Sequence, residues 1–362
     1  MKKNKQSIIF DFGSKETKII IGSSKDNHIF IRDYAIVPTP PEAVFNGRIY
    51  SKTEIGDLIK DYIKDKPIKK LNMMVSISSG DLILRNFDVP KMEESELRTA
   101  VKFELENLLP EPIDNYVMDF TILEEYKDTS DDGEEVSMLK VQTAALPKYI
   151  VEAYLLTFQK AGIGIDIVDI QSNSVAKLFG GRKKLIKDFE DEETIDKNIA
   201  IIDLGYQKTS ITIMEYGKVF LNRTINIGGF EITKTIGDIL DMDLAEAERL
   251  KVSQDYSGIE SSAIEEIQNT IDRLNQEIIM EINKIIEYFI SRSIQKKLDR
   301  VYLIGGGAKA KGIVELFEKE LNIVTKLGND YRNIEVNTDE TKFSEDLLYL
   351  CNSLGILLRE DK

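Results

Sequence analysis

A short motif occurs twice in this chain of 362 residues, once near its start and once just past its middle. Residues 8–21 align without a gap on residues 200–213. Each copy consists of an apolar strand, a tight turn containing Asp-x-Gly and a second strand rich in β-branched residues, which predicts a β-hairpin. The coinciding positions are Asp11 with Asp203, Gly13 with Gly205, and Thr17 with Thr209. The repeat therefore predicts that one supersecondary unit is built twice.

The likeness between the two halves continues beyond the hairpins. A further extended segment follows each hairpin, at residues 29–37 and 219–227, and a helical pattern comes later in each half, at residues 53–64 and 230–240. The expected class is α/β, with a mixed sheet covered by helices formed once in each half. The length agrees with two domains, since a single core rarely serves 362 residues.

A stretch without a counterpart in the second half, residues 80–166, predicts an inserted α+β subdomain. Its expected helix, residues 93–109, ends before Pro110 and Pro112, because proline cannot continue a helix. The other expected elements are strands at 82–89, 116–123 and 136–145, an acidic loop at 127–135, and a helix at 149–161. Residues 183–197 are polar and mixed in charge, which indicates a surface connection between the halves.

These patterns divide the chain into three parts. The first half is expected to comprise residues 1–79, 167–197 and 341–362, the insertion residues 80–166, and the second half residues 198–340, with a helical subdomain at 228–299. A helical pattern at 261–298 carries apolar residues near heptad spacing, which fits a coiled-coil dimer or helices that face the core of the second half. Those residues are Ile264, Ile267, Ile271, Leu274, Ile278, Ile285 and Phe289.

Charge and the rare residue types exclude several classes of function. With a formal net charge of −15, the chain is not expected to bind nucleic acid or an anionic membrane directly. The single histidine, His28, lies in a predicted strand and the single cysteine, Cys351, lies among leucines, which leaves no zinc site, disulfide framework or Ser-His-Asp triad. No apolar stretch is long enough to span a membrane. We expect a cytoplasmic protein that reaches the membrane through a partner.

The two Asp-x-Gly turns suit a ligand that carries phosphate. Glycine lets the backbone approach closely, so that successive amide groups can point at phosphate oxygens. Asp11 and Asp203 stand at strand ends, where they can hold Mg²⁺ from opposite sides, mainly through its water ligands. Asp-Gly turns are common in hairpins without any function. Two of them at the same place in a repeated unit indicate a binding site.

A third motif is the apolar strand 301–304, followed by Gly305, Gly306 and Gly307 and by a predicted helix at 313–321. Without Cβ atoms, this backbone can lie against a purine or an α-phosphate, and the helix presents its positive N-terminal end. A plain flexible connector is the alternative, but three successive glycines lose much conformational entropy on folding. The Gly-Lys-Ser/Thr ending of a P-loop is missing.

These three motifs resemble the two phosphate motifs and the adenosine motif of the actin, Hsp70 and sugar-kinase superfamily, in the same order over the whole chain. The motif segments are 11–14, 203–205 and 303–308. Residues 171–180 and 347–358 are similar to the two helices that form the hinge in that superfamily. The resemblance implies an actin-like/Hsp70-like fold of two duplicated RNase H-like domains that bind ATP and Mg²⁺ between them.

Within the superfamily, the insertion after Ser79 resembles the subdomain shared by the FtsA and PilM families. The runs 226–233 and 247–251, and the helix 98–110, are similar to the PilM pattern in particular. FtsA proteins normally end in an amphipathic membrane-targeting helix, whereas this sequence ends soon after the second hinge helix. The PilM family implies an ATP-binding cytoplasmic adaptor of type IV pilus assembly, peripheral at the cytoplasmic face of the membrane.

The same resemblance implies the partner. It is the cytoplasmic N-terminal tail of a PilN-like membrane protein, bound in a nucleotide-dependent way as part of the pilus assembly platform. A groove between the insertion and the first half is the expected place, where strand 82–89 offers an edge and helix 93–109 an apolar face. Acidic residues on that helix, Glu94, Glu104 and Glu106, suit a basic residue in the tail. Self-association stays open.

The superfamily resemblance gives each site residue a role. Asp11 and Asp203 position Mg²⁺, and Lys18 reaches the β- and γ-phosphates. Donors to the phosphates come from Gly13, Ser14, Gly205 and Thr209, the ribose and adenine are bordered by Glu248 and Lys251, and the adenosine by Gly305, Gly306 and Gly307. From the residues alone, Lys18 can equally be a solvated strand residue, and Glu248 with Lys251 an ordinary pair on a helix surface.

Gln171 aligns with the residue that orients the attacking water in the superfamily. Glutamine orients water but is a poor base, so slow hydrolysis at most is expected. Lys15 and Glu16 depart from the small residues usual in the first phosphate turn. Two other functions stay open: an FtsA-like polymerising cell-division protein, and a small-molecule kinase of the same fold, for which the sequence offers no obvious catalytic base.

Overall fold

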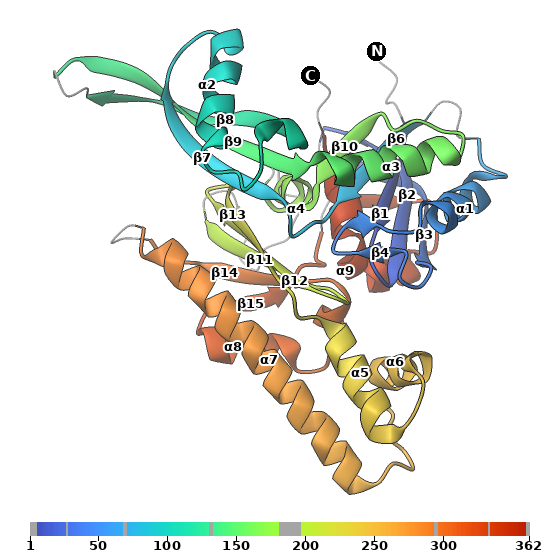
Figure 1. The fold of residues 1–362 in the computed structure, drawn as a ribbon. Coiled ribbons are helices and arrows are strands. Elements are labelled where there is room, and N and C mark those ends of the chain that lie inside the picture. Colours follow the sequence, from blue (N-terminus) through green and yellow to red (C-terminus); the bar gives the residue numbers. More distant parts are fainter. Residues whose placement is uncertain are drawn as a thin grey trace.

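The two copies of the repeated motif form two antiparallel hairpins, each in the middle of its own sheet (Figure 1). The computed structural model describes residues 6–26, 28–67, 71–129, 133–180, 197–292, 296–331 and 334–359. The paired residues beside the turns are Asp11 with Lys18 and Phe12 with Thr17 in the first hairpin, and Asp203 with Ser210 and Leu204 with Thr209 in the second. Both predicted hairpins are confirmed, and their turns occur in the same register.

The first sheet has six strands in the order β10-β6-β1-β2-β3-β16. Their bounds are β1 Ser7–Phe12, β2 Glu16–Lys25, β3 His28–Pro38, β6 Asn72–Ile77, β10 Ile167–Ile170 and β16 Ile334–Val336. β1 to β3 form an antiparallel meander, and β6 and β10 extend the sheet in parallel. Every residue of β1 is buried, as a central strand between two layers of helices requires.

The second sheet repeats this plan with five strands, in the order β13-β12-β11-β14-β15. Their bounds are β11 Asn198–Leu204, β12 Thr209–Glu215, β13 Lys218–Ile225, β14 Arg300–Ile304 and β15 Thr325–Leu327. β14 lies parallel to β11, as β6 lies parallel to β1. The predicted third strand of each half is therefore confirmed, and so is the mixed α/β class.

Helices cover both sheets (Figure 1). On the first half, α1 (Lys52–Ile63) and α3 (Lys148–Lys160) share an apolar cluster with β1, which brings Ile59, Phe158 and Phe10 together. On the second half, α8 (Ile313–Leu321) packs beside β15. A group of helices that includes α5 (Gly229–Leu240) and α6 (Leu244–Ser253) extends away from the second sheet.

The long helical pattern forms one helix, α7 (Ser261–Ile290). Near its start, Ile267 packs with Ile236 of α5, and further along Ile282 and Phe289 belong to the core of the second half. These apolar positions are therefore buried within the chain, which favours the interpretation as a core-facing helix.

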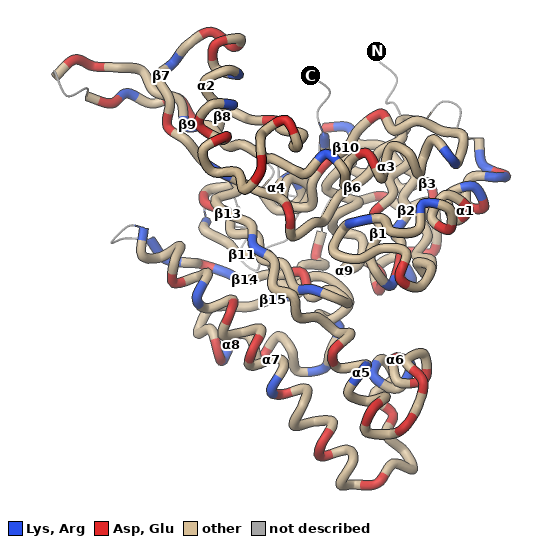
Figure 2. Tube along the Cα trace, viewed as in Figure 1, with Lys and Arg blue, Asp and Glu red and all other residues tan. Residues whose placement is uncertain are grey.

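No described helix has the length and apolar character needed to cross a membrane. Acidic and basic residues both occur in all parts of the described chain (Figure 2).

The insertion forms a separate three-stranded sheet in the order β7-β9-β8, with α2 packed on it (Figure 1). The bounds are β7 Ile83–Pro90, α2 Glu94–Glu106, β8 Tyr116–Thr129 and β9 Glu135–Pro147. β8 and β9 are longer than predicted and include part of the expected acidic loop. Leu97, Val101 and Leu105 of α2 pack on this sheet, so the apolar face that we expected to receive a partner is covered.

Two elements lie across the predicted domain boundaries. α3 falls within residues 80–166 but packs on the first half, and β16 falls within residues 198–340 but pairs with β3 of the first sheet. Most of the predicted connection, residues 183–196, lies outside the described residues. The division into three parts stays a prediction.

Two helices run between the sheets at the predicted hinge. α4 (Gln171–Gly180) and α9 (Glu340–Leu357), which begins earlier than expected, contact each other closely. At Gly355, an added Cβ would lie only 1.9 Å from the carbonyl oxygen of Ser174. Because backbone cannot move as a flexible side chain can, glycine is required where these helices meet.

The meeting of α4 and α9 gives a stability prediction. Gly355→Ala is expected to lower the free energy of unfolding by about 1 to 3 kcal/mol, because overpacking outweighs the better helix propensity of alanine. Gly56→Ala in α1 is the matched control, since its Cβ would meet its nearest neighbour at 3.6 Å, and it should stabilise by about 0.5 to 1 kcal/mol. Urea denaturation measures both; equal effects of the two changes would contradict the required contact.

Candidate functional site

A cavity of about 550 Å³ lies between the two halves, where the repeated turns face each other. All the residues to which the superfamily resemblance gave a nucleotide or metal role line it. They are Asp11, Gly13, Ser14, Lys18, Asp203, Gly205, Thr209, Glu248, Lys251, Gly305, Gly306 and Gly307. Gln171 is not among the lining residues, but its side chain contacts Asp203 from behind.

The two turns have the same backbone geometry. The amide of Gly13 donates to the carbonyl oxygen of Glu16 at 3.1 Å, and the amide of Gly205 donates to that of Lys208 at 3.0 Å. The hydroxyl of Thr209 donates to the carbonyl oxygen of Ile227 at 2.9 Å. Its hydroxyl hydrogen therefore ties β12 to the segment after β13, and does not point into the cavity as a free donor.

The carboxylate of Asp11 is buried at the end of β1, and that of Asp203 is partly buried at the end of β11. Burial raises the pKa of Asp11, with the Asp203 charge adding to the rise and Lys18 opposing it. Burial also raises the pKa of Asp203, against the opposing charges of Lys18 and Lys208. Two carboxylates whose charges repel each other suit a divalent cation, which removes their repulsion.

The donor set fits Mg²⁺ better than a metal that needs many protein ligands. Among the described residues there is no group of three or more His, Cys, Asp or Glu side chains that could hold an ion. Mg²⁺ keeps several water ligands and is commonly held by one or two carboxylates together with phosphate oxygens. The Asp11 and Asp203 pair matches that requirement.

The triple glycine lies directly against the aspartate pair. Gly305 has φ +84°, and a Cβ there would lie 2.2 Å from Oδ1 of Asp203. Its amide donates to the carbonyl oxygen of Leu348 in α9 at 2.9 Å, which fixes the loop to the hinge helix. Only glycine combines this backbone conformation with this close approach.

Glu248 and Lys251 face the cavity and are not an ordinary pair on a helix surface. Their side chains are 13% and 18% exposed, and Nζ of Lys251 lies 2.6 Å from Oε2 of Glu248. Burial alone would raise the pKa of Glu248, but hydrogen bonds from Lys15, Lys251 and Thr233 together lower it. Glu248 is therefore held as a carboxylate beside the cavity.

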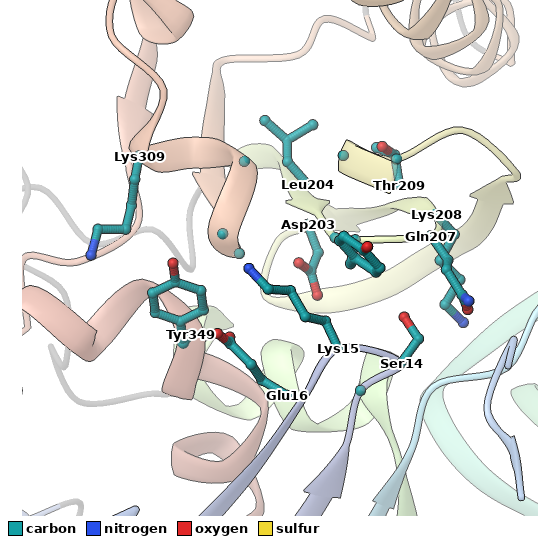
Figure 3. A pocket seen from close by; sticks show the side chains of 18 of the residues that line it. Ser14, Lys15, Glu16, Asp203, Leu204, Gln207, Lys208, Thr209, Lys309 and Tyr349 are labelled. Atoms are coloured by element: carbon teal, nitrogen blue, oxygen red, sulfur yellow. The ribbon is translucent and has the colours of Figure 1, made fainter. Parts of the chain in front are cut away.

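Lys15 reaches Glu248 from the opposite half. Its Nζ lies 2.5 Å from Oε1 of Glu248, so the first turn is joined to α6 across the cavity. Figure 3 shows Lys15 near Asp203 and Tyr349. The sequence marked Lys15 as unusual but gave it no role.

The apolar lining of the cavity, which suits a purine, was also missed from the sequence. It is made of Ile232, Ile271, Leu274, Ile278 and Ile313.

Lys18 projects into the cavity, where its Nζ donates to the carbonyl oxygen of Glu16 at 3.2 Å. Lys18 is therefore not a solvated strand residue.

Gln171 lies behind the aspartate pair. Its Nε2 donates to Oδ2 of Asp203 at 2.6 Å, and its Oε1 accepts from the hydroxyl of Ser78. Gln171 is thus oriented by groups of both halves.

The sequence also missed Lys208 and Asn352. Lys208 belongs to the second turn, where a lysine five residues after Asp203 was the available signal. Asn352 of α9 hydrogen-bonds both aspartates and lowers the pKa of each, opposing the effect of burial. Asn352 lies one turn before Gly355, and nothing in the sequence connects it with the repeated turns.

Comparison with known families gives one match over almost the whole chain. A family model described as type IV pilus assembly protein PilM matches residues 10–361. The cell division protein FtsA of Bacillus subtilis (strain 168) is 24% identical over 295 residues, which are 74% of this chain and 62% of FtsA. The chain thus spans less than two thirds of the length of that relative.

Solved structures of several proteins share the fold. The PilM-PilN type IV pilus biogenesis complex matches with a TM-score of 0.79 and 24% identity, over 98% of both chains. Ethanolamine utilization protein EutJ from Carboxydothermus hydrogenoformans has a TM-score of 0.52 and 15% identity, over 98% of this chain and 89% of EutJ. MreB5 of Spiroplasma citri bound to ADP has a TM-score of 0.50 and 14% identity, over 97% of this chain and 95% of MreB5. These likenesses confirm the actin-like fold.

The repulsion between Asp11 and Asp203 predicts that the charges needed to bind a metal lower the stability of the ligand-free protein. Asp11→Asn is expected to raise the free energy of unfolding of the ligand-free protein at pH 7 by about 1 to 2 kcal/mol, because the amide removes a buried charge that repels Asp203. The gain should shrink as the pH falls, because the raised pKa lets the wild-type carboxyl take up a proton in the folded state.

Urea denaturation without nucleotide or metal, at several pH values, measures this effect. Asp61→Asn on the exposed face of α1 is the matched control and should change stability by less than about 0.5 kcal/mol. A clear loss of stability in Asp11→Asn at pH 7 would show that the carboxylate contributes more through its contacts than its burial costs.

Proposed function

The chain belongs to the family of the type IV pilus assembly protein PilM, and from that membership we propose that it is an ATP-dependent adaptor. It binds Mg-ATP between its halves and, in that state, the cytoplasmic N-terminal tail of a PilN-like membrane protein. The tail brings it to the cytoplasmic face of the membrane and into the pilus assembly platform. The pair of Asp11 and Asp203, one from each repeated turn, carries the proposal, because nothing in the fold alone requires it.

In this proposal the ligand lies along the cavity, with its parts beside the residues that line it. Asp11 and Asp203 would hold Mg²⁺ through its waters, and Lys18 with the amides of the two turns would bind the phosphates. The triple glycine would lie against the adenosine, with Glu248 and Lys251 beside the ribose. When bound, Mg²⁺ would neutralise charge on the phosphates, and the turns of the two halves would orient them.

Hydrolysis in this proposal is slow. Gln171 can orient a water near the terminal phosphate, but an amide is a poor base. Its Nε2 is also engaged with Asp203, and its Oε1 already accepts from the hydroxyls of Ser78 and Ser210, so a water would have to compete for this oxygen. The nucleotide therefore acts mainly as a signal that closes the two halves.

The proposed docking place for the tail is a junction surface made of Phe45, Arg48, Tyr50 and Tyr149. β4 (Val44–Phe45) and β5 (Arg48–Ile49) form a small hairpin in which Phe45 is opposite Arg48. The rings of Phe45, Tyr50 and Tyr149 are 53%, 59% and 51% exposed. The guanidinium of Arg48 lies 5.1 Å from the ring centre of Tyr149. Exposed aromatic residues of this kind commonly anchor a bound peptide.

The junction surface lies where the insertion joins the first half. Arg48 donates to both carboxylate oxygens of Asp81, at 2.8 and 3.0 Å, and Asp81 lies two residues before the start of β7. Burial raises the pKa of Tyr149, and the charges of Asp81 and Glu111 raise it further. Because Asp81 is already paired with Arg48, Glu111 is an acidic residue here that suits a basic residue of a membrane protein's cytoplasmic tail. The junction surface replaces the covered face of α2 as the proposed place.

The partner proposal predicts binding that depends on nucleotide. A synthetic PilN-type N-terminal peptide should bind the Mg-ATP form at least about tenfold more tightly than the nucleotide-free form, a coupling of the usual size. Tyr149→Ala should weaken binding by about 2 kcal/mol, as loss of a central aromatic contact does. Fluorescence polarisation measures both.

Two controls make this test specific. Tyr288→Ala removes an equally exposed tyrosine from α7, far from the junction, and should leave binding unchanged. Asp203→Ala should remove the effect of ATP without removing the junction surface. The proposal fails if the peptide does not bind the ATP-loaded wild type, or binds equally with and without nucleotide.

The role of Gln171 predicts the rate of hydrolysis. Wild-type phosphate release should be about 10⁻³ s⁻¹ or slower, as in nucleotide hydrolases that orient water with glutamine alone. Gln171→Ala should lower the rate at least about tenfold, with ATP affinity little changed, because a positioned water is lost. Gln268→Ala, on the exposed face of α7, is the control. A brisk wild-type rate that Gln171→Ala leaves unaltered removes Gln171 from the mechanism.

A further inference from the structure

Lys208 crosses the cavity at the phosphate end. Its Nζ donates to the carbonyl oxygen of Ser78 at 2.7 Å and lies 3.4 Å from Oδ1 of Asn46, both in the first half. Among the described residues it forms no ion pair, and both of its acceptors are neutral. Burial lowers the pKa of Lys208 to about 8, in spite of the nearby Asp203 and Asp11 charges. Among the described residues no carboxylate contacts this ammonium group, which faces the cavity and is therefore favourably placed for an anionic ligand.

The direction of Lys208 distinguishes it from the other lysines of the cavity. Figure 3 shows Lys208 on one side of Asp203, and Lys309 with Tyr349 on the other side. The triple glycine precedes Lys309 in the chain, so the side of Lys309 is the adenosine end. A polyphosphate that starts there and passes the aspartate pair has its last phosphate on the side of Lys208.

The repeat offers an internal comparison. The first-turn residue equivalent to Lys208 is Glu16, since the carbonyl oxygens of both accept from the turn glycine. Glu16 lies beside Tyr349, toward the adenosine end (Figure 3). The same backbone position therefore carries an anion at one end of the cavity and a cation at the other, which is the arrangement that a ligand with a negative end requires.

We propose that Lys208 recognises the terminal phosphate of a nucleoside triphosphate and thereby distinguishes it from a diphosphate. This inference rests on the proposed nucleotide site. In the ligand-free protein the ammonium group donates to two neutral oxygens. A phosphate oxygen is a stronger acceptor than these, because its negative charge adds a Coulomb attraction to the hydrogen bond from the ammonium group. The ammonium group then moves from Ser78 and Asn46 to the phosphate.

This exchange reaches the insertion. Oδ1 of Asn46 also accepts from the amide of Gly80 at 3.0 Å, and the hydroxyl of Ser78 donates to Gln171. Residues 78–81 lead from β6 into β7, next to the junction surface. Removing Lys208 from Ser78 and Asn46 therefore loosens the segment that joins the insertion to the first half, and only a triphosphate does so.

The test compares affinities for the magnesium complexes of ADP and of a non-hydrolysable ATP analogue by calorimetry. Lys208→Gln should weaken binding of the triphosphate about 10- to 100-fold, which is the usual effect of losing a hydrogen bond to a charged group. It should weaken binding of ADP less than about threefold. Lys309→Gln, a lysine change at the adenosine end, should alter both affinities by the same factor. Lys208→Arg should keep the preference for triphosphate.

A second variant keeps the lysine and changes its partner. Asn46→Asp, of nearly the same shape, places a carboxylate beside the ammonium group and should lower the preference for triphosphate while ADP binding is retained. Amide hydrogen exchange at residues 78–81 should be faster with the ATP analogue than with ADP in the wild type. In Lys208→Gln it should not differ between them.

The outcomes separate the two proposals. If the wild type binds neither nucleotide, the proposed function fails, and this inference with it. If the wild type binds both, and Lys208→Gln or Asn46→Asp leaves the ratio of the two affinities unchanged, only the assignment of Lys208 is wrong. Exchange at residues 78–81 that does not respond to the third phosphate overturns the link to the insertion.

Discussion

Two like charges, Asp11 and Asp203, constrain the arrangement of everything around them. Their repulsion is tolerated only where other groups oppose it, and these come from separate elements: Lys18 from β2, Lys208 from the second turn, Gln171 from α4 and Asn352 from α9. The two sheets and the two hinge helices must therefore meet at one place. The close contact of α4 and α9 at Gly355 follows from the same requirement, because it brings Gln171 and Asn352 to the aspartates.

The fold was predictable as far as local patterns specify it. The hairpins and the third strands of each half follow from alternation and turn residues that lie within about 30 residues of one another. Local patterns do not reveal which other element an amphipathic helix or strand packs against. The pattern of α2 correctly predicted a helix with a buried face, but the face lies on its own subdomain, and α3 was placed in the insertion although it packs on the first half.

Within the site, the residues of the repeat were found because a duplicated turn is visible in sequence. Lys15, Lys208 and Asn352 were missed because their partners are far away in the chain and no periodicity links them. Thr209 was placed at the cavity correctly but was expected to donate to a phosphate. Its hydroxyl instead donates to the carbonyl oxygen of Ile227. Position in a motif predicts where a residue lies better than it predicts which atom is free to bind.

The duplicated turns also send one lysine each into the opposite half. Lys15 of the first turn meets Glu248 near the adenosine end, and Lys208 of the second turn meets Ser78 near the phosphate end. The first contact is an ion pair with a largely buried carboxylate, and the second uses only neutral acceptors. Since the charged contact is the stronger of the two, the halves are held more firmly at the adenosine end. An anionic ligand therefore acts mainly on the phosphate end, where the segment that leads into the insertion begins.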